Sequence, residues 1–313
     1  MELRVMQTSD VQHIYFCADR KYLFCTSAVM ASILANSLPH SRQVFHIISD
    51  DIITADLAKL KELNNIKSCD IVLHAIKKED FADYAGMDFG YISLGCFFRL
   101  KILDFAPEGV NKVLYLDGDM IVTAPLDELF DTDLEGYYAG VVEEKSAIQV
   151  QNLRLKSGRY FNSGMILFNL PALKGHNLPV EAAKWFKYNH EWMIMRDQDI
   201  LNGIWDGKVK FVEQKFNVPS FVKDFANPVI IHYTGFVKKP WHFYCRHSLK
   251  NEWLKYAQLT AYRKSPFQLF LFKTVRFLSK IFYFAKDPTH KNYYILCVLG
   301  MNFGLGKKDN KHR

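Results

Sequence analysis

The sequence predicts a single α/β domain of about 250 residues, followed by a basic C-terminal tail. Three observations lead to this prediction. The 313 residues are 49% hydrophobic and 23% charged, which is typical of a chain that buries a large core. Short apolar runs alternate with helical patterns in the first quarter of the chain, which favours βαβ units and a mostly parallel sheet. Eleven of the 40 Lys and Arg residues but only two of the 33 acids follow residue 260, so residues 261–313 carry +9 and residues 1–260 carry −2.

The expected elements follow from the spacing of apolar residues. Strands are predicted where a short apolar run is bounded by polar or turn-forming residues: 11–18, 43–49, 69–76, 112–116, 138–142 and 165–170. Helices are predicted where Ala, Leu and Met dominate, or where aromatic residues recur at helical spacing before residues that end a helix. These segments are 21–36, 55–64 with Thr54 as its N-cap, 97–105 and 180–190.

Cysteine usage and the chain ends indicate a compartment. The six cysteines include no C-x-x-C pair and no zinc-site spacing, and the first 20 residues lack the basic and apolar regions of a signal peptide. The sequence therefore predicts a cytosolic protein with reduced thiols. A transmembrane helix is not expected, because Lys273, Arg276 and Lys280 interrupt the longest apolar stretch, 267–284.

Two carboxylates directly follow the predicted strand 112–116. Asp117 and Asp119 stand at its carboxyl end, the edge of an open α/β sheet where ligands bind. With Gly118 between them, both can turn toward one hard cation such as Mg²⁺ or Mn²⁺. The plain alternative is a solvated turn.

Asp131-Thr132-Asp133 has the same D-x-D pattern after a polar segment and is interpreted as surface. Taken alone, the pair Asp117 and Asp119 fits two enzyme classes. One is a nucleotide-sugar transferase that holds a metal on a diphosphate. The other is a phosphohydrolase of the haloacid dehalogenase kind, with an aspartate nucleophile.

Three later segments favour the transferase: Phe161–Met165 (FNSGM), Arg196–Asn202 (RDQDILN) and Ile231–His242 (IHYTGFVKKPWH). Together with Tyr115–Asp119 (YLDGD) they occur in the order seen in glycosyltransferase family 8. The chain therefore resembles these retaining α-hexosyltransferases, which include lipopolysaccharide galactosyl- and glucosyltransferases. The resemblance extends from about Tyr15 to His242 and implies a GT-A-like nucleotide-sugar-binding fold over 1–260.

The resemblance implies a metal site that bridges the two donor phosphates. Its ligands would be Asp117, Asp119 and His232, and its ion Mn²⁺ or, as the alternative, Mg²⁺. A lysine before Pro-Trp would neutralise the leaving diphosphate; Lys239 is the aligned residue and Lys238 the alternative. Gly235 would let the backbone approach the diphosphate closely.

The remaining site residues are assigned by the resemblance to a donor, UDP-glucose or UDP-galactose. Asp19 would bind the uracil or ribose and Tyr22 would stack on the base, while Lys21 stands where relatives often have Asn. Side chains expected at the hexose are Arg99, Asn162, Ser163, Asp197, Gln198 and Asp199. Asp197, Gln198 and Asp199 are the expected catalytic residues, with Gln198 near the anomeric carbon. The alternative for Arg99 is a surface charge on a helix.

The tail, 261–313, is predicted to associate with a membrane. Lys273, Arg276 and Lys280 form one helical stripe within 267–284, a segment that is otherwise largely apolar and aromatic, and this suits an anionic surface. The alternative is a helix packed on the domain with a solvated basic edge. Nucleic-acid binding is not expected, because no recognition motif accompanies the basic residues.

Together these inferences predict a UDP-hexose-dependent retaining α-glycosyltransferase that extends a lipopolysaccharide core or a related glycolipid. The resemblance places such an enzyme at the cytoplasmic face of the inner membrane. A front-face mechanism is the favoured route, because no residue is a secure nucleophile. Two alternatives are a metal-dependent phosphohydrolase and a non-catalytic, membrane-associated carbohydrate-binding protein.

Overall fold

The structure is a computed structural model, and it describes most of the chain. Backbone and side chains are described for residues 11–77, 79–81, 94–219, 222, 225–235, 239–242, 245 and 249–278. The backbone alone is described for three further strands, 282–286, 293–298 and 301–306.

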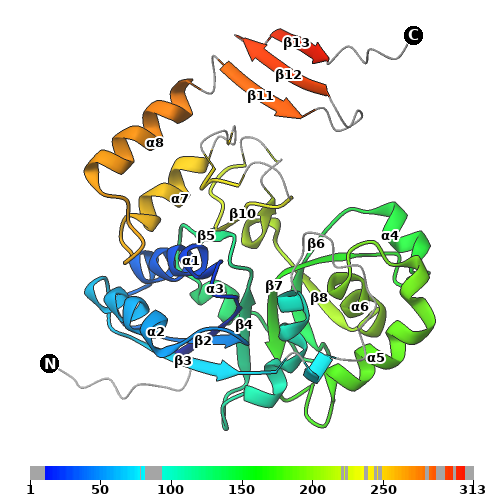
Figure 1. Ribbon diagram of the computed structural model, residues 1–313. Helices are drawn as coiled ribbons and strands as arrows, with labels where there is room; N and C mark the ends of the chain where they lie inside the picture. The colour runs from blue at the N-terminus through cyan, green and yellow to red at the C-terminus, as the bar shows by residue number, and fades with distance from the viewer. Residues whose placement is uncertain are drawn as a thin grey trace, which may run out of the picture.

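A seven-stranded sheet forms the centre of the molecule (Figure 1). Its strands, in spatial order, are β3 (Cys69–Ala75), β2 (Arg42–Ser49), β1 (Val11–Cys17), β4 (Lys112–Leu116), β7 (Phe161–Asn169), β6 (Ala139–Glu143) and β8 (Val209–Val212). The first four run parallel, whereas β7 is antiparallel to both of its neighbours, and β8 is again parallel to β6. The sheet is therefore mixed, because β7 runs opposite to the other strands, but the other six all run in one direction and the prediction of a mostly parallel sheet is correct for them.

Helices cover both faces of this sheet (Figure 1). They are α1 (Leu23–Asn36), α2 (Thr54–Leu60), α3 (Asp127–Phe130), α4 (Ala147–Asn152), α5 (Leu178–Asn189), α6 (Asp197–Ile204), α7 (Lys250–Ala257) and α8 (Pro266–Leu278). Segments of 3₁₀-helix span Lys61–Asn65, Leu94–Phe105, His190–Trp192 and Gln214–Phe216. The helix predicted over 97–105 is thus a 3₁₀ segment that begins three residues earlier.

The alternation of side chains along β1 divides the interior into two cores. Ile14 and Phe16 enter the core that contains α1, whereas Tyr15 enters the core under the 94–105 segment, α5 and α6. Successive side chains of a strand point to opposite faces, and both faces here are covered. This double coverage explains why residues 14–18 form a continuous apolar run in the sequence.

Helix α1 is buried around most of its circumference and ties the sheet to a smaller one. The smaller sheet consists of β5 (Met120–Val122), β10 (Ile230–His232) and β9 (Val218–Pro219). Ser32 Oγ accepts a hydrogen bond from the Val122 amide at 2.9 Å, and Asn36 Nδ2 donates to the Val122 carbonyl at 3.0 Å. These bonds fix β5, and therefore the turn that precedes it, against α1.

The start of α2 differs from the prediction. Thr54 is the first helical residue, and the cap position is Ile53. The Ile53 amide donates instead to Asp56 Oδ2 at 3.2 Å, so a carboxylate in the first turn satisfies an amide at the helix start.

The tail also differs from the predicted basic helix over 267–284. Helix α8 ends at Leu278, and the chain beyond forms a three-stranded antiparallel sheet of β11 (Phe282–Lys286), β12 (Tyr293–Val298) and β13 (Met301–Gly306). Aromatic and β-branched residues such as those of YYILCV favour strands, which accounts for the change. Among the described helices, none has both the length and the apolar character needed to cross a membrane.

Helix α8 does not expose the predicted basic stripe. Arg276 is only 6% exposed, whereas Phe267, Phe270 and Phe277 are 60–74% exposed. Leu269 and Phe272 pack against the core that contains α1, so the predicted boundary at residue 260 lies within a packed region. Lys280 falls outside the described residues. The outward face of α8 is thus mainly apolar rather than basic.

Candidate functional site

The turn that carries the two acids is held between β7 and the end of β10. The Asp117 amide donates to the Gly164 carbonyl at 2.8 Å, and the Tyr233 amide donates to the Asp119 carbonyl at 3.0 Å. Because β10 pairs antiparallel with β5, His232 stands opposite Met120, immediately after the turn. Backbone pairing therefore brings a histidine from late in the chain beside both carboxylates.

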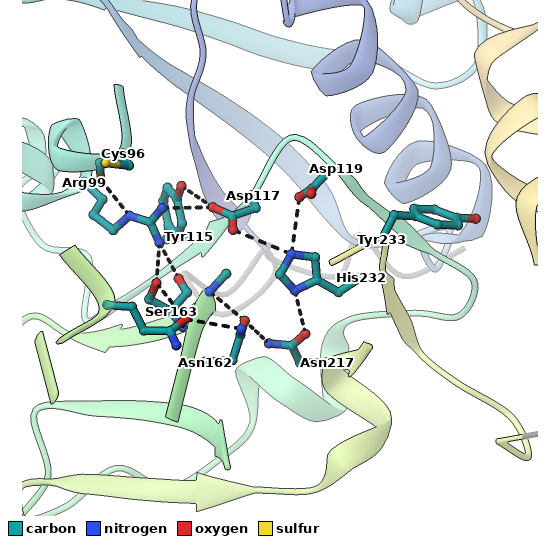
Figure 2. A network of polar contacts seen from close by, with 12 residues as sticks. Cys96, Arg99, Tyr115, Asp117, Asp119, Asn162, Ser163, Asn217, His232 and Tyr233 are labelled. Carbon is teal, nitrogen blue, oxygen red and sulfur yellow. Dashed lines mark hydrogen bonds and ion pairs between the residues drawn. The ribbon is translucent and has the colours of Figure 1, made fainter. Parts of the chain in front are cut away.

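The side chains of Asp117, Asp119 and His232 form one cluster (Figure 2). His232 Nε2 lies 3.3 Å from Asp119 Oδ1 and 3.7 Å from Asp117 Oδ2. The other ring nitrogen, Nδ1, lies 3.0 Å from Asn217 Oδ1, which can only accept a hydrogen bond. Asn217 therefore fixes a proton on Nδ1 and aims Nε2 at the two carboxylates, so that Nε2 could offer its lone pair to a cation held between them, the arrangement of a metal-binding histidine.

Space for a cation depends on Gly164. A Cβ atom at this position would lie 2.5 Å from His232 Cε1 and 2.8 Å from Asp117 Oδ2, so any side chain would displace the cluster. Two carboxylates and an imidazole suit a divalent ion such as Mn²⁺ or Mg²⁺. The residues present thus fit the metal that the resemblance implies.

Lys239 contacts the Asp119 carboxylate oxygen that does not face His232. Its Nζ donates to Asp119 Oδ2 and to the Tyr233 carbonyl, both at 2.5 Å. Burial would raise the pKa of Asp119, but the neighbouring His232 and Lys239 outweigh burial and hold this pKa below its ordinary value. Asp119 is therefore a carboxylate available for a cation. Lys238 lies outside the described residues, and Gly235 has a positive φ of 86° that suits glycine.

Arg99 belongs to the polar network beside Tyr115 and Ser163 and does not lie at the surface (Figure 2). Its Nη1 donates to the Ser163 carbonyl at 2.6 Å and to Ser163 Oγ at 3.1 Å, and its Nη2 donates to Asp117 Oδ1 at 3.1 Å. Its Nε donates to the Cys96 carbonyl and lies 3.0 Å from Asp197 Oδ2. With 5% exposure, Arg99 is not the surface charge considered as the alternative. All three nitrogens already bind protein groups, which favours a positioning role for Arg99 over direct contact with the hexose.

The three residues at the start of α6 have different surroundings. Burial raises the pKa of Asp197 to about 6, against the lowering effect of Arg99 and with a further raising effect from Asp117. Gln198 Oε1 accepts the Ser163 amide at 3.0 Å. Arg196, which precedes them, has a φ of 50°, a strained value for a non-glycine residue and one often found beside functional side chains.

Asp199 is completely buried. Tyr160 donates its hydroxyl proton to Asp199 Oδ1 at 2.5 Å, and the Ile194 and Met195 amides donate to Oδ2 at 2.6 Å. Both carboxylate oxygens therefore bind protein donors. This arrangement favours a positioning role for Asp199 over the direct hexose contact expected from the sequence.

Asn162 connects the metal cluster to the start of α6. Its Oδ1 accepts from Asn217 Nδ2 at 2.9 Å, and its Nδ2 donates to Glu144 Oε2 at 2.9 Å. Gln198 Nε2 donates to the same Glu144 oxygen at 3.3 Å and to the Tyr160 hydroxyl at 2.9 Å. An unbroken set of hydrogen bonds thus joins His232 to Gln198.

The predicted nucleotide residues lie at the carboxyl end of β1. Asp19 Oδ1 accepts the Tyr22 amide at 2.9 Å, and the Tyr22 side chain is 51% exposed at the start of α1. A Cβ on Gly118 would lie 2.7 Å from Thr26 Oγ1, so the first turn of α1 adjoins the acidic turn. Asp19 and Tyr22 therefore share one sheet edge with Asp117 and Asp119.

Three network residues were missed in the sequence: Glu144, Tyr160 and Asn217. Glu144 follows β6 directly, so the carboxyl-end rule that selected Asp117 could also have found it. Tyr160 directly precedes the Phe161–Met165 motif, which could have pointed to it, whereas Asn217 belongs to no motif and is brought to the site by tertiary packing. The second D-x-D pattern, by contrast, is confirmed as surface, because Asp131 and Asp133 are exposed.

Known proteins are similar to this chain in sequence and in fold. The chain is 29% identical over 256 residues to the lipopolysaccharide 1,3-galactosyltransferase of Salmonella typhimurium, covering 75% of this chain and 74% of that protein. It is 26% identical over 274 residues to a lipopolysaccharide 1,2-glucosyltransferase of Escherichia coli, covering 80% and 79%. The crystal structure of the galactosyltransferase LgtC with donor and acceptor sugar analogs matches with a TM-score of 0.70 at 26% identity, covering 80% and 96%. The family pattern itself spans residues 13–245, and the chain therefore belongs to glycosyl transferase family 8.

Proposed function

We propose that this glycosyltransferase moves glucose or galactose from a UDP-hexose, with retention, onto a lipopolysaccharide core or a related glycolipid. The observation that carries the proposal is His232 Nε2 facing Asp117 and Asp119, with Lys239 beside them. Relatives that use lipopolysaccharide acceptors support the acceptor class. Family membership favours this proposal over the phosphohydrolase.

The metal site would serve the departure of UDP. A divalent cation, Mn²⁺ by preference, would be held by Asp117, Asp119 and His232 and would stabilise charge on the leaving diphosphate. Lys239 already forms an ion pair with Asp119, so its ammonium stands at the side of the cluster where a second positive charge can meet a phosphate.

The hexose would bind between the metal cluster and the start of α6. Asn162 and Gln198 each donate a hydrogen bond to Glu144, and all three are candidates to bind the hydroxyl groups of the hexose. Asp197 is paired with Arg99 and buried, which leaves it poorly placed as a nucleophile. A front-face reaction, in which the leaving phosphate assists deprotonation of the acceptor, agrees with this arrangement.

The acceptor would be met at a membrane surface, at the cytoplasmic face of the inner membrane. Helix α8 displays Phe267, Phe270 and Phe277 outward, each at least 60% exposed. An amphipathic helix with such a face lies in the interface of a bilayer, and the basic residues of the tail add attraction to anionic lipids. We propose residues 261–313 as this membrane-associating part and residues 1–260 as the catalytic part.

A donor screen tests the proposal. UDP-glucose and UDP-galactose would be supplied with truncated core acceptors, with Mn²⁺ or with EDTA, and products would be identified by mass spectrometry. We expect hexose transfer that requires the metal and is lost in Asp119→Asn. The matched control is Asp131→Asn, in the exposed D-x-D pattern, which should retain activity. Release of phosphate from sugar phosphates without UDP would instead support the hydrolase.

A further inference from the structure

Arg276 is the exception on helix α8. The helix exposes large apolar side chains to solvent and buries this one charged residue to 6% exposure. A surface helix normally buries its apolar residues and solvates its charged ones. A guanidinium is costly to bury, so its inward position requires partners that offset the loss of water.

Those partners are backbone carbonyls in the segment that follows Lys239. Arg276 Nη2 donates to the Pro240 carbonyl at 2.5 Å and to the His242 carbonyl at 3.3 Å. The guanidinium also lies over the Phe272 ring, 4.4 Å from its centre, which adds a cation–π contact within α8. Arg276 thereby binds the residues on both sides of Trp241.

Residues 239–242 form a turn that is fixed from several sides. The His242 amide donates to the Lys239 carbonyl at 3.0 Å, which closes the turn. The Trp241 ring contacts Phe24 of α1 edge-on at 5.7 Å and Trp253 of α7 at 5.5 Å between ring centres. Arg276 therefore holds this turn by hydrogen bonds to its backbone, and the Phe24 and Trp253 rings hold it by packing against Trp241.

The same turn carries the lysine of the active site. Lys239 directly precedes Pro240, whose ring restricts the backbone of the residue before it. Its side chain reaches Asp119 Oδ2 and the Tyr233 carbonyl. A shift of the Pro240 or His242 carbonyl would therefore move the Lys239 ammonium relative to the metal ligands.

We propose that Arg276 is a positioning residue for the transfer reaction, because it holds the 239–242 turn so that Lys239 is directed at the donor diphosphate. The inference rests on the proposed function, in which Lys239 meets that diphosphate. It makes α8 a structural part of the active site and not only a membrane contact. The tail would then be needed even for donors and acceptors free in solution.

A double-mutant cycle tests this inference on the full-length protein. Hydrolysis of the UDP-hexose by water would be measured for Arg276→Met, Lys239→Met and the double variant, without membranes. We expect Arg276→Met to lower kcat about 10–100-fold with a smaller change in KM, since misplacing a reacting group by about 1 Å can cost about 100-fold. In the Lys239→Met background the same substitution should cost less than about 2-fold, because the group it positions is already gone.

Controls separate positioning from folding. Lys273→Met changes an exposed charge on the same helix and should leave hydrolysis unchanged. Arg276→Lys should recover part of the lost kcat; it also serves as the test variant if Arg276→Met fails to give a native circular dichroism spectrum. Equal fold losses in the wild-type and Lys239→Met backgrounds, or no loss at all, would overturn the inference.

The proposed function and this inference fail in different ways. If the wild-type protein turns over neither UDP-glucose nor UDP-galactose, the proposed donor is wrong. The same cycle would then be read from the affinity for UDP with Mn²⁺, measured by calorimetry. Weaker binding in Arg276→Met but not in the Lys239→Met background supports positioning, and equal weakening in both refutes it.

Discussion

Two buried histidines of the described residues, His232 and His46, differ in what their ring nitrogens meet. His232 faces two carboxylates through Nε2 and an amide oxygen through Nδ1. His13, His46 and His74, on β1, β2 and β3, instead form a histidine row. His13 Nδ1 lies 3.0 Å from His46 Nε2, and His46 Nδ1 lies 2.9 Å from His74 Nε2.

The row can be satisfied without any charge. Each N–H···N link needs one proton and one lone pair, so three neutral rings can make both links. Burial, followed by the charges of His13 and His74, lowers the pKa of His46 to about 3. Burial also lowers the pKa of His13, with a further effect of Arg42, and that of His74. A histidine ring that faces acids can thus serve as a ligand of the proposed metal, whereas a ring that faces other histidine rings contributes to packing.

The largest expected effect comes from replacing His232, and the matched control replaces His46 of the histidine row. His232→Gln should lower Mn²⁺ affinity by more than about 100-fold, since loss of a partner that only orients a ligand already costs about 10–100-fold. His46→Gln should leave the affinity unchanged. Isothermal titration with Mn²⁺ measures both. A strong loss of affinity in His46→Gln would break the distinction between the groups.

The next effect concerns the amide that orients His232. Asn217→Ala removes the acceptor of the Nδ1 proton and should lower Mn²⁺ affinity about 10–100-fold. Asn217→Asp keeps an acceptor at that place and should lose less. The same titration compares the two variants, and equal losses would show that Asn217 acts through packing and not through this bond.

The histidine row should make folding sensitive to acid. Because the folded pKa of His46 is about 3 and its unfolded value is about 6.5, the unfolded chain binds more protons between these values. The free energy of unfolding should therefore be highest above pH 6.5 and should decrease as pH falls below that value. Protonation of His46 in the unfolded chain accounts for a decrease of about 2 kcal/mol at pH 5.

Urea unfolding of the wild type and His46→Phe at pH 7 and pH 5 measures this contribution. The groups that face His46 are His13, His74 and Tyr15, with Arg42 acting on His13, and all are unchanged in the variant. The variant should lose less stability between the two pH values. Parallel losses in both proteins would contradict the assignment.

The smallest effect is expected at Tyr15, which stacks on His46 with ring centres 4.2 Å apart. Its hydroxyl donates to the Phe105 carbonyl at 2.8 Å, so Tyr15→Phe should lower the free energy of unfolding by about 1 kcal/mol. Transfer activity should stay within 2-fold of the wild type. A clear loss of activity with unchanged stability would place the row in catalysis.

The acidic turn was predictable because its signal is local. A strand, two acids and a glycine are adjacent in the sequence, and the carboxyl-end rule applies to them directly. Arg99 was found only through the family resemblance, and its contacts are with Ser163 and Asp197, which are distant in sequence.

Other features depend on pairing that the sequence does not encode locally. The antiparallel direction of β7 has no signature in an apolar run, because a strand buried on both faces looks the same in either direction. The inward turn of Arg276 was missed for a related reason. Helical periodicity shows which residues of α8 share a face, but it does not show which face packs against the domain. Here the carbonyls of Pro240 and His242 draw the face with Arg276 inward.

The pairing of β10 with β5 has a consequence for how the protein matures. A nascent chain already contains Asp117 and Asp119 long before Ile230–His232 is synthesised, yet its acids are not joined by an imidazole until β10 docks. Binding of the proposed divalent cation would thereby be postponed until almost the whole of residues 1–260 has folded. The cation would then stabilise the chain late in folding, and a truncated or misfolded chain would compete poorly for it.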